Sequence, residues 1–250
     1  MKSIRLLGSL IASFTLSVNS YAADIVMEPA PVSKIFVPHG FDTNDHIEVV
    51  LHGYLPNGCY KPGDIDVNVD HGAPGEKGRV EISAFVARHM QDYCIEILIE
   101  YKEVVKVGYL EAKEYEIYLT EQDINPSDGL KVSFSQTSGP DDHVYLPVDS
   151  VAVEASETGQ ELILRGAYPA QKDKCLSPDR YEIYRAPDSV LIVLPIAQVT
   201  SCDGQAPQGF EYRVPLSEDM KISKGMMVHV RSLNGHSVNK VYDWALFSGF

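Results

Sequence analysis

One phrase occurs twice in this chain. Residues 51–64 read LHGYLPNGCYKPGD, and residues 164–179 read LRGAYPAQKDKCLSPD. Each begins with Leu, a basic or His residue and Gly, has a Pro three positions after the Gly and a Cys further on, and ends in a Pro followed closely by an Asp. This repetition predicts that the chain holds two copies of one structural unit.

Short runs rich in Val, Ile and Tyr surround each copy and predict strands rather than helices. In the first half they are Ile47–Leu55, Asp64–Asp70, Arg79–Ala87, Cys94–Tyr101, Val104–Leu110 and Tyr115–Leu119. In the second half they are Gln160–Tyr168, Tyr181–Ala186, Ser189–Val199, Phe210–Leu216 and Met226–Leu233, and upstream Ile35–Gly40 is matched with Val144–Asp149. Six or seven short strands per half predict an all-β chain of two tandem immunoglobulin-like β-sandwich domains.

The N-terminus has the features of a signal peptide. Lys2 and Arg5 precede a mostly apolar stretch, and Ser20 and Ala22 suit cleavage after Ala22. We therefore expect a signal peptide over residues 1–22, a first domain over 23–135 and a second over 136–250. Residues 120–129 read as a linker, and residues 130–136 as either a last strand of the first domain or part of that linker. Neither the apolar stretch of the signal peptide nor any later apolar run is long enough to predict a transmembrane segment.

The four cysteines all follow the signal peptide. An even number in an exported chain favours two disulfides, and four cysteines allow three connectivities. Because the repeat assigns two cysteines to each copy, we expect the pairs Cys59–Cys94 and Cys175–Cys202. The expected location is the periplasm or the outside of the cell.

The chain is acidic, with a formal net charge of -14. Loss of Lys2 and Arg5 with the signal peptide would take that charge to -16. An acidic surface repels phosphate backbones, so the sequence argues against nucleic acid as a partner.

The first copy resembles a module found in bacterial exported proteins and lipoproteins. The resemblance rests on GYLPNGCY, which fits the pattern Gly-x-x-Pro-x-x-Cys-Tyr, on a later lone Cys and on VGYLEAKEYEI. It covers some seventy residues of the first half. The second half departs from the pattern, because it lacks the Cys-Tyr pair and has Met226 or Met227 where Tyr115 would stand. The resemblance implies an immunoglobulin-like fold and carries no activity.

Residues 64–70 place Asp64, Asp66, Asn68 and Asp70 at every second position. A helix-loop-helix calcium loop needs Gly at its sixth position and Glu at its twelfth, and neither possible start provides them. Ile65, Val67 and Val69 alternate with the polar residues, so the segment predicts a strand with one solvated face. Cation capture at Asp70 by loop oxygens is the alternative.

Histidines and motifs give little support for metal or catalytic chemistry. The sequence contains no His-Glu-x-x-His stretch, no two-Cys zinc knuckle, no Gly-x-Ser-x-Gly elbow and no phosphate-binding glycine loop. His52 follows Leu51 on an expected strand, so we expect it to face solvent. We expect no metal site, no cofactor and no catalytic residue, although a pair of carboxylates brought together by the fold could support glycoside hydrolysis.

Basic side chains gather around Cys175. Lys172, Lys174, Arg180 and Arg185 lie on one expected loop and the strand after it. Solvated charges are the simpler interpretation. The alternative is a partner-binding patch for an acidic surface, including the first domain of another copy.

These features favour a non-catalytic, exported binding or adaptor protein of the bacterial cell envelope. Tandem sandwiches offer loops and strand edges, and strand edges recruit partners by strand addition. The expected partner is an envelope protein or a surface polymer. The alternatives are a secreted surface or matrix component and a hydrolase of envelope polymers.

Overall fold

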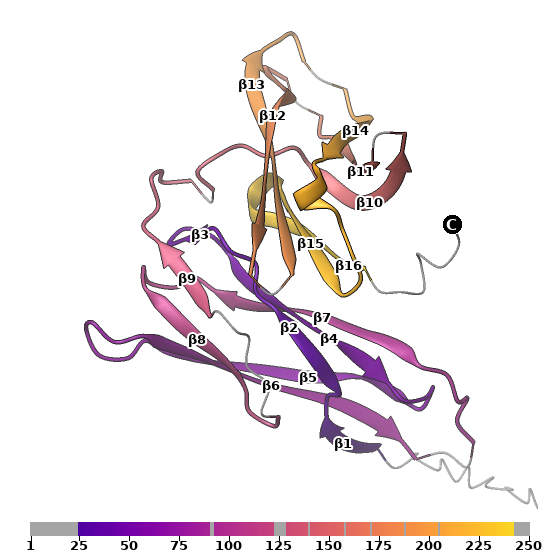
Figure 1. Ribbon diagram of the computed structural model, residues 1–250. Coiled ribbons are helices and arrows are strands. Elements are labelled where there is room, and N and C mark those ends of the chain that lie inside the picture. The colour runs from indigo at the N-terminus through magenta and orange to yellow at the C-terminus, as the bar shows by residue number, and fades with distance from the viewer. Residues whose placement is uncertain are drawn as a thin grey trace, which may run out of the picture.

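The computed structural model describes residues 25–90, 93–122, 129–139, 141–157, 159–170, 172–187, 189–204 and 206–242. These residues form an all-β structure of sixteen strands with two short 3-10 helices, Glu218–Met220 and Leu233–Gly235 (Figure 1). The expected signal peptide and the C-terminal residues 243–250 lie outside the described residues.

The first half contains two sheets that enclose one core. A three-stranded sheet has the order β2-β4-β7, and a larger sheet has the order β1-β6-β8-β9-β3 with β5 also paired to β6. The core draws side chains from both sheets, including Ile47, Leu51, Ile82 and Ile117. The strands are β1 Ile25–Pro29, β2 Val32–Phe36, β3 Phe41–Asp42, β4 Ile47–Leu55, β5 Tyr60–Asp70, β6 Gly78–His89, β7 Ile99–Gly108, β8 Glu114–Leu119 and β9 Leu130–Ser133.

The second half repeats this arrangement. A three-stranded sheet β10-β11-β14 faces a four-stranded sheet β12-β13-β15-β16, and a second core lies between them, with Leu162, Leu164, Leu191 and Val228 fully buried in it. The strands are β10 Val148–Ser156, β11 Gly159–Tyr168, β12 Lys174–Ala186, β13 Val190–Ser201, β14 Gln208–Leu216, β15 Met226–Ser232 and β16 His236–Tyr242.

Seven strands correspond one to one between the halves. In each half the first, second and fifth of them form the three-stranded sheet, and the others form the sheet that faces it. The same parallel pair occurs in both, β6 with β8 and β13 with β15. A shared parallel pair is a specific feature, so the two copies inferred from the repeated phrase are one topology used twice.

The glycine of the repeated phrase has the same role in both halves. A Cβ at Gly53 would lie 1.9 Å from the carbonyl oxygen of Pro31, and a Cβ at Gly166 would lie 1.9 Å from the carbonyl oxygen of Pro147. Each glycine pairs with the residue after that proline, Val32 or Val148, next to a break in register. The counterpart of Pro147 is therefore Pro31. The expected match of residues 35–40 with 144–149 is wrong, because it aligned Pro147 with Pro38.

The two disulfides join Cys59 to Cys94 and Cys175 to Cys202, the pairing expected from the repeat. In each half the bond links the start of the third corresponding strand to the segment that follows the fourth. Both bonds therefore tie the start of a β-hairpin to the segment that leads from this hairpin to the facing sheet.

Two other predictions, for the solvated face of β5 and for a linker between the halves, can be compared with the structure. Strand β5 alternates exposed and half-buried residues from Asp64 to Asp70, so the prediction of one solvated face is confirmed. The linker prediction for residues 120–129 is wrong, because this segment joins β8 to β9, which pair with each other. Strand β9 is thus a strand of the first half.

The two halves share a third cluster of buried side chains. Phe36 of β2 and Val50 of β4 pack against Val190, Ile192 and Met227 of the second half. Figure 1 shows the second half standing on the sheet that contains β2, β4 and β7. Covered on both faces, β4 is buried along almost its whole length.

The burial of β4 overturns the expectation that His52 faces solvent. His52 is only 6% exposed, because its face of β4 is the one turned toward the second half. Its ring lies edge-on to Phe36 and Tyr54, and its Nε2 atom is 3.5 Å from a carboxylate oxygen of Glu100. Alternation along a strand predicts a solvated side chain only when one face of the sheet meets water.

Candidate functional site

Edge strands carry backbone groups that no neighbouring strand satisfies, and proteins protect such edges with proline, bulges or charge. Strands β5, β12 and β14 each contain a proline, Pro62, Pro178 and Pro215 respectively. Register breaks also interrupt β5 and β12 next to their prolines. At β10, the Ser232 hydroxyl donates a hydrogen bond to the carbonyl of Val148 at 3.0 Å.

Strand β7 is less protected, because it carries charged side chains such as Glu103 and Lys106 but has a register break only near its end. It pairs only with β4 in the described chain, and its ten residues include no proline. Apolar side chains are exposed along and beside it: Val104 is 38% exposed, Tyr109 57%, and Leu98 69%. The edge of β7 is therefore a long, proline-free edge of the described residues with exposed apolar side chains beside it, which suits it to accept another strand.

The segment before β7 extends the same surface. The sequence predicts a strand over residues 94–101, but β7 begins only at Ile99. Cys94 is held by its disulfide, and the carbonyl of Ile95 accepts a hydrogen bond from the amide of Gly58. Tyr93, Ile95 and Ile97 are all exposed. This stretch has the composition of a strand and, among the described residues, no ladder to join.

Tyr101 of β7 lies between two charged residues. Glu100 and Lys102 lie on the face that meets the second half, where the ammonium of Lys102 donates to the carbonyl of Asn239 at 3.2 Å. Tyr101 points into the core, and burial, aided by the nearby Glu103 carboxylate, raises the pKa of Tyr101 to about 12. One face of β7 is thus anchored, whereas its outer edge stays open.

A buried ionic network joins the halves near β15. Arg231 lies with its Nη1 atom 2.7 Å from Asp45 Oδ1 and 3.3 Å from Asp141 Oδ1, and its Nη2 donates to the carbonyl of Gly40 at 2.7 Å. All three charged side chains are almost fully buried. The network ties the turn before β4, the connector between the halves and β15 into one rigid junction.

A second polar cluster lies beside it. Glu48 accepts hydrogen bonds from Ser237 and from the side-chain amide of Asn239, and His229 Nδ1 lies 2.8 Å from Asn239 Oδ1. Burial lowers the pKa of His229, against the opposing effect of Glu48. The adjoining cavity has a volume of about 10 Å³, enough for one water. These groups hold the two halves together and leave no room for a substrate.

The ionic network predicts an unusual pH dependence. Burial raises the pKa of Asp141 to about 6, despite the opposing effect of Arg231. Since this pKa lies above the unfolded value of 3.8, the group stabilises the fold below pH 4 and loses that contribution as pH rises to about 6. We expect the difference in unfolding free energy between wild type and Asp141→Asn to fall by about 2 kcal/mol from about pH 4 to about pH 6.5. Denaturant melts across this range measure it, and a constant difference would contradict the expectation.

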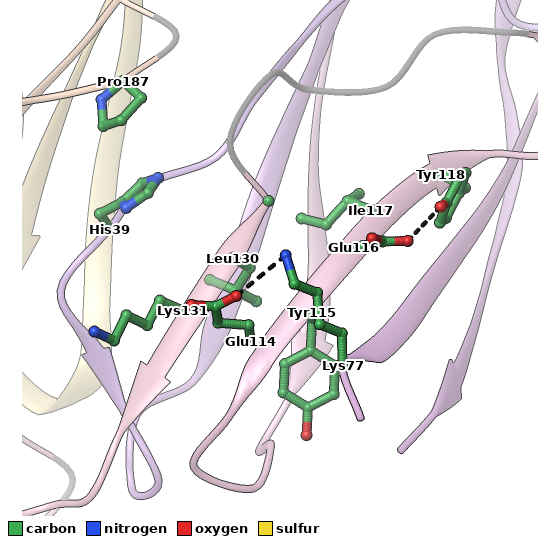
Figure 2. A pocket seen from close by; sticks show the side chains of 11 residues that line it. His39, Lys77, Glu114, Tyr115, Glu116, Ile117, Tyr118, Leu130, Lys131 and Pro187 are labelled. Atoms are coloured by element: carbon green, nitrogen blue, oxygen red, sulfur yellow. Dashed lines mark hydrogen bonds and ion pairs between the residues drawn. The ribbon is translucent and has the colours of Figure 1, made fainter. Parts of the chain in front are cut away.

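An open cleft lies beside the β8–β9 pair and reaches Pro187 of the second half. It has a volume of about 530 Å³ and is lined by charged residues of both signs. Figure 2 shows the ammonium of Lys77 directed at the carboxylate of Glu114, and the hydroxyl of Tyr118 directed at the carboxylate of Glu116. His39 borders the cleft on the side of the second half. With these charges paired internally, the open cleft offers no concentrated field for a charged ligand.

The basic residues predicted to bind a partner are distributed along β12. Lys172 and Lys174 are exposed around its beginning, and Arg185 lies near its end, more than about 30 Å away at roughly 3.3 Å per residue. Arg180 forms ion pairs with Asp179 and Glu182, and Arg185 donates to the carbonyls of Asp219 and Lys221. The structure does not bring the four side chains into one patch.

Two further features concern metals and membranes. Within the ranges that the structure covers, no three His, Cys, Asp or Glu side chains are placed to hold a metal ion. No helix in these ranges is long and apolar enough to cross a membrane.

Sequence reasoning missed the features that define these sites. Asp45 and Arg231 are far apart in the chain, so no local pattern connects them. The open edge had a signal, since residues 95–107 form a long strand-like run without proline. Comparison with protein-family models, curated proteins and solved structures finds no match for this chain.

Proposed function

We propose that this protein is a non-catalytic, exported binding protein that holds an extended segment of a partner by strand addition at the edge of β7. The supporting observation is the state of that edge: β7 is long, free of proline and flanked by exposed Ile95, Ile97 and Leu98. Main-chain hydrogen bonds would supply affinity, and alternate side chains would supply specificity.

The frame of this proposal is a pair of tandem immunoglobulin-like domains, residues 23–135 and 136–250. Two facing sheets per half, with a core between them, support this division. The parallel pairs β6–β8 and β13–β15 depart from the antiparallel sheets of immunoglobulins, so the likeness would be one of layering rather than of exact strand order.

Binding is favoured over catalysis by where the titratable groups lie. Two clusters of ionisable side chains, around Arg231 and His229, are buried in the junction between the halves. Two disulfides are consistent with an oxidising compartment. We therefore place the protein in the periplasm or outside the cell, with an envelope protein as its partner.

A cross-linking pull-down from the cell envelope tests the proposal. We expect the mature, oxidised protein to capture one dominant protein, and the double variant Ile97→Lys, Leu98→Lys to lose most of that capture. Both side chains are exposed, so the fold should be retained. The matched control is Phe134→Lys, which replaces another exposed apolar side chain away from β7.

Other results of these experiments would support a different site or a different function. Capture that survives the double variant would rule out β7 as the site. Absence of any captured protein would favour a surface or matrix component, to be followed with polysaccharide arrays. Hydrolysis of an envelope polymer by the pure protein would overturn the binding assignment.

A further inference from the structure

We infer that a second copy of this chain can occupy the edge of β7, with the two β7 strands antiparallel about a two-fold axis at Tyr101. This inference rests on the proposed use of the β7 edge and names one partner for it. The two sheets β2-β4-β7 would then join into one continuous sheet across the dimer.

The charges on one face of the segment fit this register. In an antiparallel pair centred on Tyr101, Glu100 lies opposite Lys102 of the second copy, and Glu96 lies opposite Lys106. The two-fold axis produces each pair twice. Opposite charges in directly facing positions stabilise antiparallel strands, and like charges destabilise them.

The apolar residues fit the same register. Leu98 lies opposite Val104 of the second copy, and both side chains are exposed in the single chain. On the other face, Ile97 lies opposite Val105 and Ile95 lies opposite Val107. The pairing thus covers exposed apolar side chains that the single chain leaves in water.

Neighbouring registers that keep the faces matched are less favourable. A pair centred on Glu100, Lys102 or Glu103 places that charged residue directly opposite its own copy. In an antiparallel pair, the numbers of two facing residues add up to a constant. This sum must be even for facing side chains to lie on the same face of the sheet, so the register can shift only by two in this sum. Self-complementarity therefore favours the register at Tyr101 over those beside it.

Pairing in this register also accounts for residues 93–98. They have the β-branched and aromatic composition of a strand, yet β7 begins at Ile99. Pairing with residues 104–108 of a second copy would supply the missing ladder and lengthen β7 toward Cys94. The net charge of -14 opposes association over long range, but screening limits this repulsion to about 8 Å at physiological salt.

Sedimentation velocity with charge-swap variants tests this inference. We expect the wild type to show a concentration-dependent monomer–dimer equilibrium. Glu100→Lys and Lys102→Glu should each weaken it about tenfold, because each places two pairs of like charges across the axis. An equimolar mixture of the two variants should restore the dimer, because the lysine introduced at position 100 of one copy then faces the glutamate introduced at position 102 of the other.

Controls keep the outcomes distinct. Lys172→Glu with Lys174→Glu changes exposed charge away from β7 and should leave the equilibrium unchanged. Circular dichroism checks that each variant folds. A wild type that stays monomeric at every concentration, or a mixture that associates no better than its components, would overturn the second copy as the partner. Envelope capture lost in Ile97→Lys, Leu98→Lys would in that case still support the proposed function.

Discussion

Replacing Arg231 by Met is expected to lower the free energy of unfolding by about 3–5 kcal/mol. The change leaves Asp45 and Asp141 buried without their cation, and it removes a hydrogen bond to the carbonyl of Gly40. The guanidinium also lies 4.8 Å from the ring centroid of Phe41, so a cation–π contact is lost as well. Urea melts measure the effect.

Two further variants show whether burial of the unpaired charge is the cause. Arg180→Met removes exposed ion pairs with Asp179 and Glu182 and should cost less than about 1 kcal/mol. Adding Asp45→Asn and Asp141→Asn to Arg231→Met should recover part of the loss, because no unpaired buried charge remains. A loss below about 1 kcal/mol for Arg231→Met would show that the network contributes little to the junction.

The largest steric effects are expected at the two glycines of the repeated phrase. Gly53→Ala and Gly166→Ala each put a methyl group 1.9 Å from a proline carbonyl oxygen, so the backbone immediately before β2 or β10 must move. We expect each to lower the unfolding free energy by about 3 kcal/mol or more. Similar losses at both positions would also support their equivalence.

Gly209 provides the matched control. It lies in β14, next to β11, and a Cβ there would be 3.8 Å from the carbonyl oxygen of Gly166, an ordinary van der Waals contact. Gly209→Ala should therefore be neutral or slightly stabilising, because it only reduces the freedom of the unfolded chain. If Gly53→Ala were as mild as this control, the close approach of β2 to β4 would not constrain the sequence.

Local pattern was enough to predict several features of the fold. The repeated phrase indicated two copies, and the assignment of two cysteines to each copy led to the pairing that the structure has. Alternation from Asp64 to Asp70 predicted the solvated face of β5, because that face meets no other layer. These features depend on neighbours in sequence or on a simple in-or-out rule.

Features that depend on the contact between the halves could not be predicted in this way. His52 has the position of a solvated residue on β4, but the second half covers that face. Asp45, Asp141 and Arg231 look like ordinary surface charges until the fold places them together. The basic residues near Cys175 are close in sequence, but an extended strand spreads them over its length.

Acceptance of a strand by the β7 edge is tested most directly by hydrogen exchange. Exchange of the full protein would be compared with and without a synthetic peptide of residues 94–107 that carries Ser in place of Cys94. We predict slower exchange across residues 96–106 of the protein and unchanged exchange along β5, β12 and β14. Unchanged exchange in β7, or protection at another edge instead, would contradict strand addition at β7.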